Sequence, residues 1–224
     1  MFPYAKDGVR KIYVAEILAL IGTVLGLIAL VGIVLTTASD EVGADVLAGG
    51  AALGTILASA VFGVLMVISY IMTIIGVSKA GKDEESFRSA MLWIVIAMTA
   101  SVLQGFLEPK SEMASSLFST ISSCCNLIIT YYILTGVVHL ANRMGNDEVK
   151  AVASKSLKLV CAAYLIVAAV KLILTVMGGV GGTTMQGILF GSGAVITVIA
   201  AIVGIIGYIL YIRALSRASA MLEG

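Results

Sequence analysis

Residues 46–77 read VLAGGAALGTILASAVFGVLMVISYIMTIIGV, a run without a single charged side chain. A helix needs roughly 20 mostly apolar residues to cross about 30 Å of hydrocarbon, so this run is long enough to span a membrane. Five further apolar runs occupy residues 11–37, 90–107, 113–140, 157–177 and 183–212. The sequence therefore predicts an all-α integral membrane protein with six transmembrane helices.

The composition of the whole chain points the same way. Of its 224 residues, 60% are hydrophobic and 12% are charged, whereas soluble domains carry about 25% charged residues. Intrinsic disorder, a coiled coil and a secreted disulfide scaffold are excluded on the same grounds. The connecting segments are too short for a soluble domain, so residues 1–224 are predicted to form a single transmembrane domain.

The basic residues indicate the orientation of the helices. All 14 except Lys110 and Lys171 lie near the two termini or around the loops that follow the second and fourth predicted helices. Because Lys- and Arg-rich loops stay in the cytoplasm, both termini are predicted to be cytoplasmic. A cleaved signal peptide fits the first run poorly, since that run is too long and contains Glu16. The short loops fit a bacterial cytoplasmic membrane.

Similar segments recur along the chain. AKDGVRK at 5–11, GKDEESFR at 81–88 and GNDEVK at 145–150 each precede an odd-numbered predicted helix, and YIMT at 70–73, YILT at 132–135 and YILY at 208–211 end the even-numbered ones. These segments predict three parallel two-helix hairpin repeats, over about 5–80, 81–144 and 145–224. The alternative is that interfacial tyrosine and lysine are general features of membrane helices, without any repeat.

The fourth predicted helix carries an unusual polar face, on which residues recur every three or four positions: Ser115, Ser119, Ser122, Asn126 and Thr130. Such groups seek hydrogen-bond partners in hydrocarbon. Two interpretations remain open. The hydroxyl groups pack closely against neighbouring helices, or they line a hydrated path. A path would run along Gln104, Ser119, Ser122, Asn126 and Lys171, and Ala97 and Ser101 share the face of Gln104.

Other titratable residues have simpler explanations. Glu16 lies close to Lys11, so its side chain is predicted to reach the cytoplasmic head groups. His139 lies near Arg143 and is interpreted as a solvated residue of the interface. The acidic residues that open the third and fifth predicted helices complement the helix dipole.

No pattern for catalysis or cofactor binding stands out. Cys124, Cys125 and Cys161 have no CxxC spacing and are predicted to be free, buried thiols. We expect no metal and no cofactor, and we expect the protein not to be an enzyme. Nucleic-acid binding is not expected either, because the basic residues follow the topology and form no patch.

Three functional classes remain open. The first is a transporter, channel or membrane-embedded transport component. The second is a non-catalytic scaffold or accessory subunit that binds another membrane protein or a second copy through faces of small residues such as Gly22 and Gly26. The third and least supported is an enzyme acting on lipid or peptide, since no nucleophile and base are paired. Each of them has the lipid bilayer as its surroundings.

Overall fold

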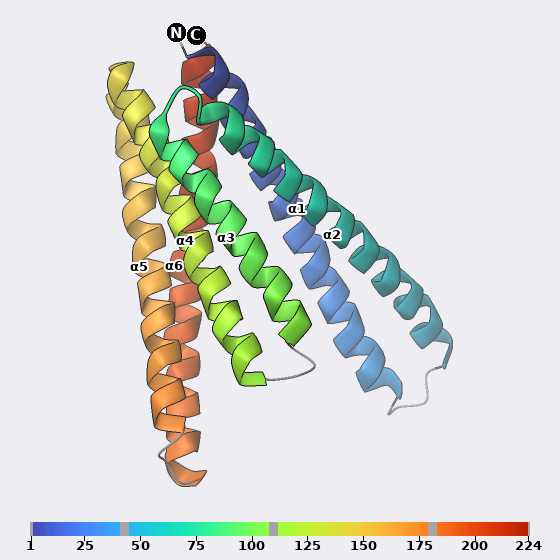
Figure 1. Ribbon diagram of the computed structural model, residues 1–224. Coiled ribbons are helices and arrows are strands. Elements are labelled where there is room, and N and C mark those ends of the chain that lie inside the picture. Colours follow the sequence, from blue (N-terminus) through green and yellow to red (C-terminus); the bar gives the residue numbers. More distant parts are fainter. Residues whose placement is uncertain (1, 41–44, 108–111, 179–182, 224) are drawn as a thin grey trace.

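The chain folds into six helices (Figure 1): α1 (Pro3–Asp40), α2 (Asp45–Ala80), α3 (Glu85–Leu107), α4 (Glu112–Arg143), α5 (Asp147–Gly178) and α6 (Thr183–Glu223). This computed structural model describes the backbone of residues 2–40, 45–107, 112–178 and 183–223. It describes side chains over the same ranges except at 30, 32–40, 45–53, 55, 112–117, 119, 167–178 and 183–202. Helix makes up 95% of the chain, and the described residues contain no strand. The all-α prediction is confirmed.

Five helical segments are long and apolar enough to cross a membrane within the described part of the chain: Pro3–Ala29, Ile56–Ala80, Glu85–Leu107, Thr120–Arg143 and Val203–Glu223. The predicted crossing at 157–177 runs into side chains that are not described, so it stays a prediction. The structure thus supports a helical membrane protein that crosses the bilayer several times.

The helices extend beyond the apolar runs. α1 begins at Pro3 rather than at residue 11, and α6 ends at Glu223 rather than at residue 212. The sequence reading placed helix ends where hydrophobicity fell, and this was wrong. A charged segment stays helical when one of its faces packs, and here Val9 and Leu215 on those extensions are fully buried.

The first and last helices meet at one end of the bundle, where α1 begins and α6 finishes; we call this the termini end (Figure 1). Each helix packs most extensively against its neighbour in the chain, giving the hairpins α1/α2, α3/α4 and α5/α6. The hairpins contact one another mainly through α4 with α5, α1 with α6 and α2 with α3. Away from the termini end, the α1/α2 hairpin diverges from the other four helices (Figure 1).

The described core lies toward the termini end. Its largest side chains without solvent contact include Ile12, Phe87 and Leu134. Each hairpin is also joined at this end by an ion pair between the start of its first helix, or the residue just before it, and its second helix: Asp7 with Lys79, Glu84 with Arg143, and Glu148 with Arg217. The three hairpins therefore carry an ion pair at the same end. That they are internal repeats stays a prediction.

Serine hydroxyls link the helices of each hairpin deeper in the bundle. Ser69 Oγ donates to the carbonyl of Ala15 at 2.8 Å, and Ser156 Oγ donates to the carbonyl of Gly207 at 3.3 Å. In the middle hairpin the Ser101 and Ser122 hydroxyls lie 3.1 Å apart. Such bonds between helices satisfy polar groups where water is absent.

The three cysteines are free, but they are not equally buried. Cys125 is buried as predicted, Cys161 is partly exposed and Cys124 is exposed. The prediction was wrong for Cys124, because neighbouring residues on a helix point about 100° apart, so a core-facing Cys125 turns Cys124 outward.

Glycine lets α1 and α2 touch backbone to backbone near the termini end. A Cβ atom on Gly76 would lie 2.8 Å from the carbonyl oxygen of Gly8 and 2.8 Å from Ile12 Cγ1. No side chain fits there unless the helices separate, so these glycines set the spacing of the first hairpin.

We expect Gly76→Ala to lower the free energy of unfolding by about 1–3 kcal/mol, because the added methyl group overpacks a helix contact. Thermal or denaturant unfolding of the detergent-solubilised protein measures this change. Gly63→Ala is the matched control on the same helix, since nothing lies within 4 Å of a Cβ at that position. Equal effects of the two substitutions would contradict the close contact.

Candidate functional site

A carboxylate from the first helix lies against two tyrosines from the last. The Tyr208 hydroxyl donates to Glu16 Oε2 at 2.9 Å, and the Tyr211 hydroxyl donates to Glu16 Oε1 at 3.2 Å. Tyr208 and Tyr211 are three residues apart and so share one face of α6. Both carboxylate oxygens thus accept a hydrogen bond from α6, which joins α1 to α6 inside the bundle.

This arrangement corrects the sequence interpretation of Glu16. Its side chain was expected to reach toward the cytoplasmic head groups, but it points to the tyrosines on α6. The expectation failed because it considered α1 alone. Once α6 packs on α1, the phenol groups offer donors inside the bundle, and the carboxylate need not reach water.

Glu16 borders a cavity of about 180 Å³, which we call the central cavity. Helices from all three hairpins line it. Its polar lining consists of Glu16, Ser69, Tyr70, Thr73, Asn126, Thr130 and Tyr211. Its apolar lining consists of Ala19, Met66, Ile94, Ile129 and Ile133. No Lys or Arg is among the described residues that line it, so the carboxylate has no fixed counter-ion there.

A second cavity of about 260 Å³ lies between α2, α3 and α4. It shares Tyr70 and Asn126 with the central cavity and is further lined by Ser101 and Ser122. The two cavities therefore adjoin at Tyr70 and Asn126, and together they follow the polar face of α4.

The structure brings together part of the predicted polar path. Asn126 lines both cavities and Ser122 lines the second, whereas Gln104 borders neither of them. The side chains of Ser119 and Lys171 lie outside the described residues. Ser122 packs against Ser101 and also lines the second cavity, while Asn126 lines both cavities, and the hydration of this face stays a prediction.

Sequence reasoning missed the contributions of the other helices to this site. Tyr208 and Tyr211 had been noted only as part of a repeated helix end, and Ser69, Tyr70 and Thr73 on α2 had not been linked to α4. The available signal was polar spacing: residues 69, 70 and 73 lie within about one turn of helix in an otherwise apolar run.

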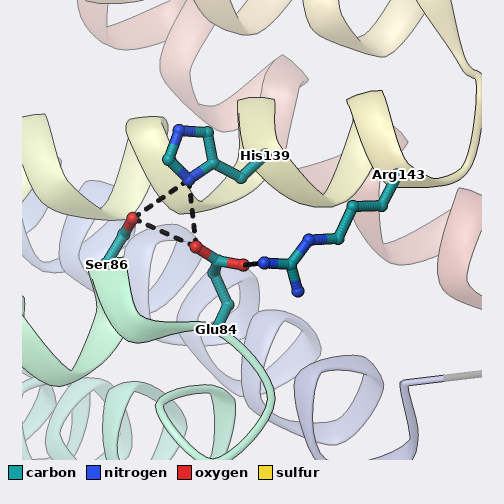
Figure 2. A network of polar contacts seen from close by, with 4 residues as sticks. All are labelled: Glu84, Ser86, His139 and Arg143. Atoms are coloured by element: carbon teal, nitrogen blue, oxygen red, sulfur yellow. Dashed lines mark hydrogen bonds and ion pairs between the residues drawn. The ribbon is translucent and has the colours of Figure 1, made fainter.

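A second polar cluster lies at the termini end, around the buried carboxylate of Glu84 (Figure 2). His139 Nδ1 lies 3.0 Å from Glu84 Oε1, and Arg143 Nη2 lies 3.1 Å from Oε2. Ser86 Oγ donates to Glu84 Oε1 at 3.3 Å. These contacts join the start of α3 to the end of α4.

The structure changes the interpretations of His139 and of the acidic residues before α3. His139 is half exposed but contacts Glu84, so it is more than a solvated residue of the interface. The acidic residues before α3 do not serve only the dipole of α3. Asp83 Oδ2 accepts the backbone N–H of Ala5 at 2.7 Å in the first turn of α1, so it supports the start of a different helix.

Among the described side chains, no three His, Cys, Asp or Glu residues gather where they could hold a metal ion. Comparisons with protein-family models, with curated proteins and with solved structures gave no match.

The Glu84 cluster yields a stability prediction. We expect Arg143→Gln to destabilise the protein several times more than Arg217→Gln, as measured by denaturant unfolding. Glu84 has a side chain only 3% exposed, whereas Glu148, the partner of Arg217, is 74% exposed. Removing the partner of a buried charge leaves that charge uncompensated, while exposed pairs contribute about 0–1 kcal/mol. Similar losses in the two variants would contradict this account.

The cavities yield a prediction about water. In a chain whose three native cysteines are replaced by alanine, Asn126→Cys and Thr130→Cys should react with a charged, water-soluble thiol reagent several times faster than Ile121→Cys. The reactive form is the thiolate, which needs a polar surrounding, and Ile121 lies on the exposed apolar surface of the same helix. Equal rates at the three positions would mean that the cavities hold no water.

Proposed function

We propose that the protein moves a small polar or charged solute across a membrane through the central cavity. The observation that carries this proposal is the Glu16 carboxylate, which lies inside the bundle and borders a cavity lined by polar side chains. Ionisable groups inside membrane spans are costly and typically mark ion or substrate pathways.

The arrangement of polar groups supports transport over simple packing. Helices that only pack need small residues and mutual hydrogen bonds, and neither requirement calls for a carboxylate. The Asn126 amide makes no side-chain hydrogen bond with the described residues and lies where the two cavities adjoin. A free amide at such a position can exchange hydrogen bonds with water or a passing solute.

The proposal includes the topology expected from the sequence. Six crossings in three parallel hairpins, with both termini in the cytoplasm of a bacterium, would place the three hairpin ion pairs on the cytoplasmic side. The distribution of Lys and Arg supports this orientation. No bond-breaking chemistry is assigned to the chain.

The test is solute flux into vesicles reconstituted with the purified protein, followed by light scattering after osmotic steps with glycerol, urea, ammonium chloride and potassium acetate. We expect faster entry of at least one of these than into empty vesicles. Asn126→Leu should reduce that flux about tenfold, because a passing polar solute loses its hydrogen bond to the amide, worth roughly 1.5 kcal/mol.

Asn142→Leu is the matched control for this test. It makes the same substitution on the same helix, at an exposed position at the termini end, and should leave the flux unchanged. Flux equal to that of empty vesicles for all four probes would contradict transport. The alternative expected from the sequence, a scaffold or accessory subunit, would then lead, and a stable complex in mild detergent would be its sign.

A further inference from the structure

We infer that the central cavity binds a small organic ammonium ion, with its charged group at Glu16 and its hydrocarbon part against the apolar wall. This inference rests on the proposed function and names the class of solute. It draws on three features of the cavity: which hydrogen atoms of its hydroxyl groups are already committed, what kind of wall faces Glu16, and how large the space is.

Four hydroxyl groups around the cavity already donate their hydrogen atoms within the protein. Thr73 Oγ1 donates to the carbonyl of Ser69 at 3.0 Å, and Thr130 Oγ1 donates to the carbonyl of Asn126 at 3.0 Å. Ser69 Oγ donates to Ala15 O, and the Tyr211 hydroxyl donates to Glu16. A hydroxyl has one hydrogen atom and two lone pairs. These groups can therefore offer a ligand only acceptor oxygens.

The remaining polar groups do not change the excess of acceptors over donors in the cavity lining. Of the described polar side chains that line the cavity, only the Tyr70 hydroxyl and the Asn126 amide keep a hydrogen atom for a ligand, and each also carries an acceptor oxygen. A lining rich in acceptors, with one carboxylate and no described cation, attracts donors and positive charge. An ammonium group, which has three donors and no acceptor, fits it.

The apolar wall favours an organic ion over an inorganic one. Bare metal cations bind where oxygen atoms surround them, but here Met66, Ile94 and Ile129 line the same space as Glu16. A short alkyl chain can cover such residues while its ammonium end lies at the carboxylate.

The volume suits a small ligand. About 180 Å³ corresponds to roughly six water molecules at about 30 Å³ each. An ammonium ion with a chain of three to five carbons has about that many non-hydrogen atoms.

Calorimetric titration of the protein in lipid nanodiscs tests the inference with three probes of one chain length: butylammonium chloride, 1-butanol and sodium butyrate, each corrected for empty nanodiscs. We expect butylammonium to bind about tenfold or more tightly than butanol, since hydrogen bonds between charged partners are stronger than those between neutral ones. Butyrate should not bind.

Two substitutions test whether butylammonium binds at Glu16. Glu16→Gln should weaken butylammonium binding to the level of butanol, whereas Glu85→Gln, the same substitution at an exposed position, should leave it unchanged. If Glu16→Gln does not fold, Thr130→Val and Thr130→Ser replace it. Valine removes one acceptor and should weaken binding several-fold, and serine should restore it.

Several outcomes would overturn the ammonium site. These are equal binding of butylammonium and butanol, binding of butyrate, unchanged binding in Glu16→Gln, or competition by millimolar sodium chloride with butylammonium. The outcome for transport is separate. Binding of butylammonium without flux of any solute would support the site and contradict transport. Flux of glycerol without binding of butylammonium would support transport and contradict the site.

Discussion

The hydrogen bonds from Tyr208 and Tyr211 to Glu16 join the first helix of the chain to the last and so tie the first hairpin to the third. A carboxylate cannot lie in hydrocarbon without partners. Here both of its oxygens are met by neutral donors from α6, so α1 and α6 must stay side by side. With α1 held to α6, the α1/α2 hairpin closes against the other helices at the termini end (Figure 1).

Polar side chains find their partners in different ways at different depths of the bundle. At the termini end, charged side chains pair between the helices of each hairpin, and glycines bring α1 and α2 into backbone contact. Deeper in the bundle, the pairs of helices are linked by serine hydroxyls instead. Around the central cavity, Thr73 and Thr130 bond to carbonyls of their own helices, which satisfies the hydroxyl hydrogen without filling the space between helices. The polar groups of the cavity wall are thus largely satisfied without side chains reaching across the cavity.

The fold was largely predictable, whereas the site was only partly so. Apolar runs identify six helices because length and hydrophobicity alone decide whether a segment can cross a bilayer. The helix ends were wrong by up to a few turns, since packing keeps charged turns helical. Asn126 was found because polar residues on one helix face can be counted. Glu16 was misread because its partners, Tyr208 and Tyr211, lie almost the whole chain away, and one helix read alone does not reveal which other helix will pack against it.

The polar face of α4 shows how packing and a cavity can share one helix. Ser122 satisfies its hydroxyl against Ser101 and so helps to hold α3 to α4. One turn further on, Asn126 has no partner of this kind among the described residues and borders both cavities. The difference comes from the neighbours: Ser122 meets a hydroxyl group on α3, while no described side chain bonds to the Asn126 amide. A stripe of polar residues therefore does not have one role along its length, because each turn of the helix meets a different neighbour.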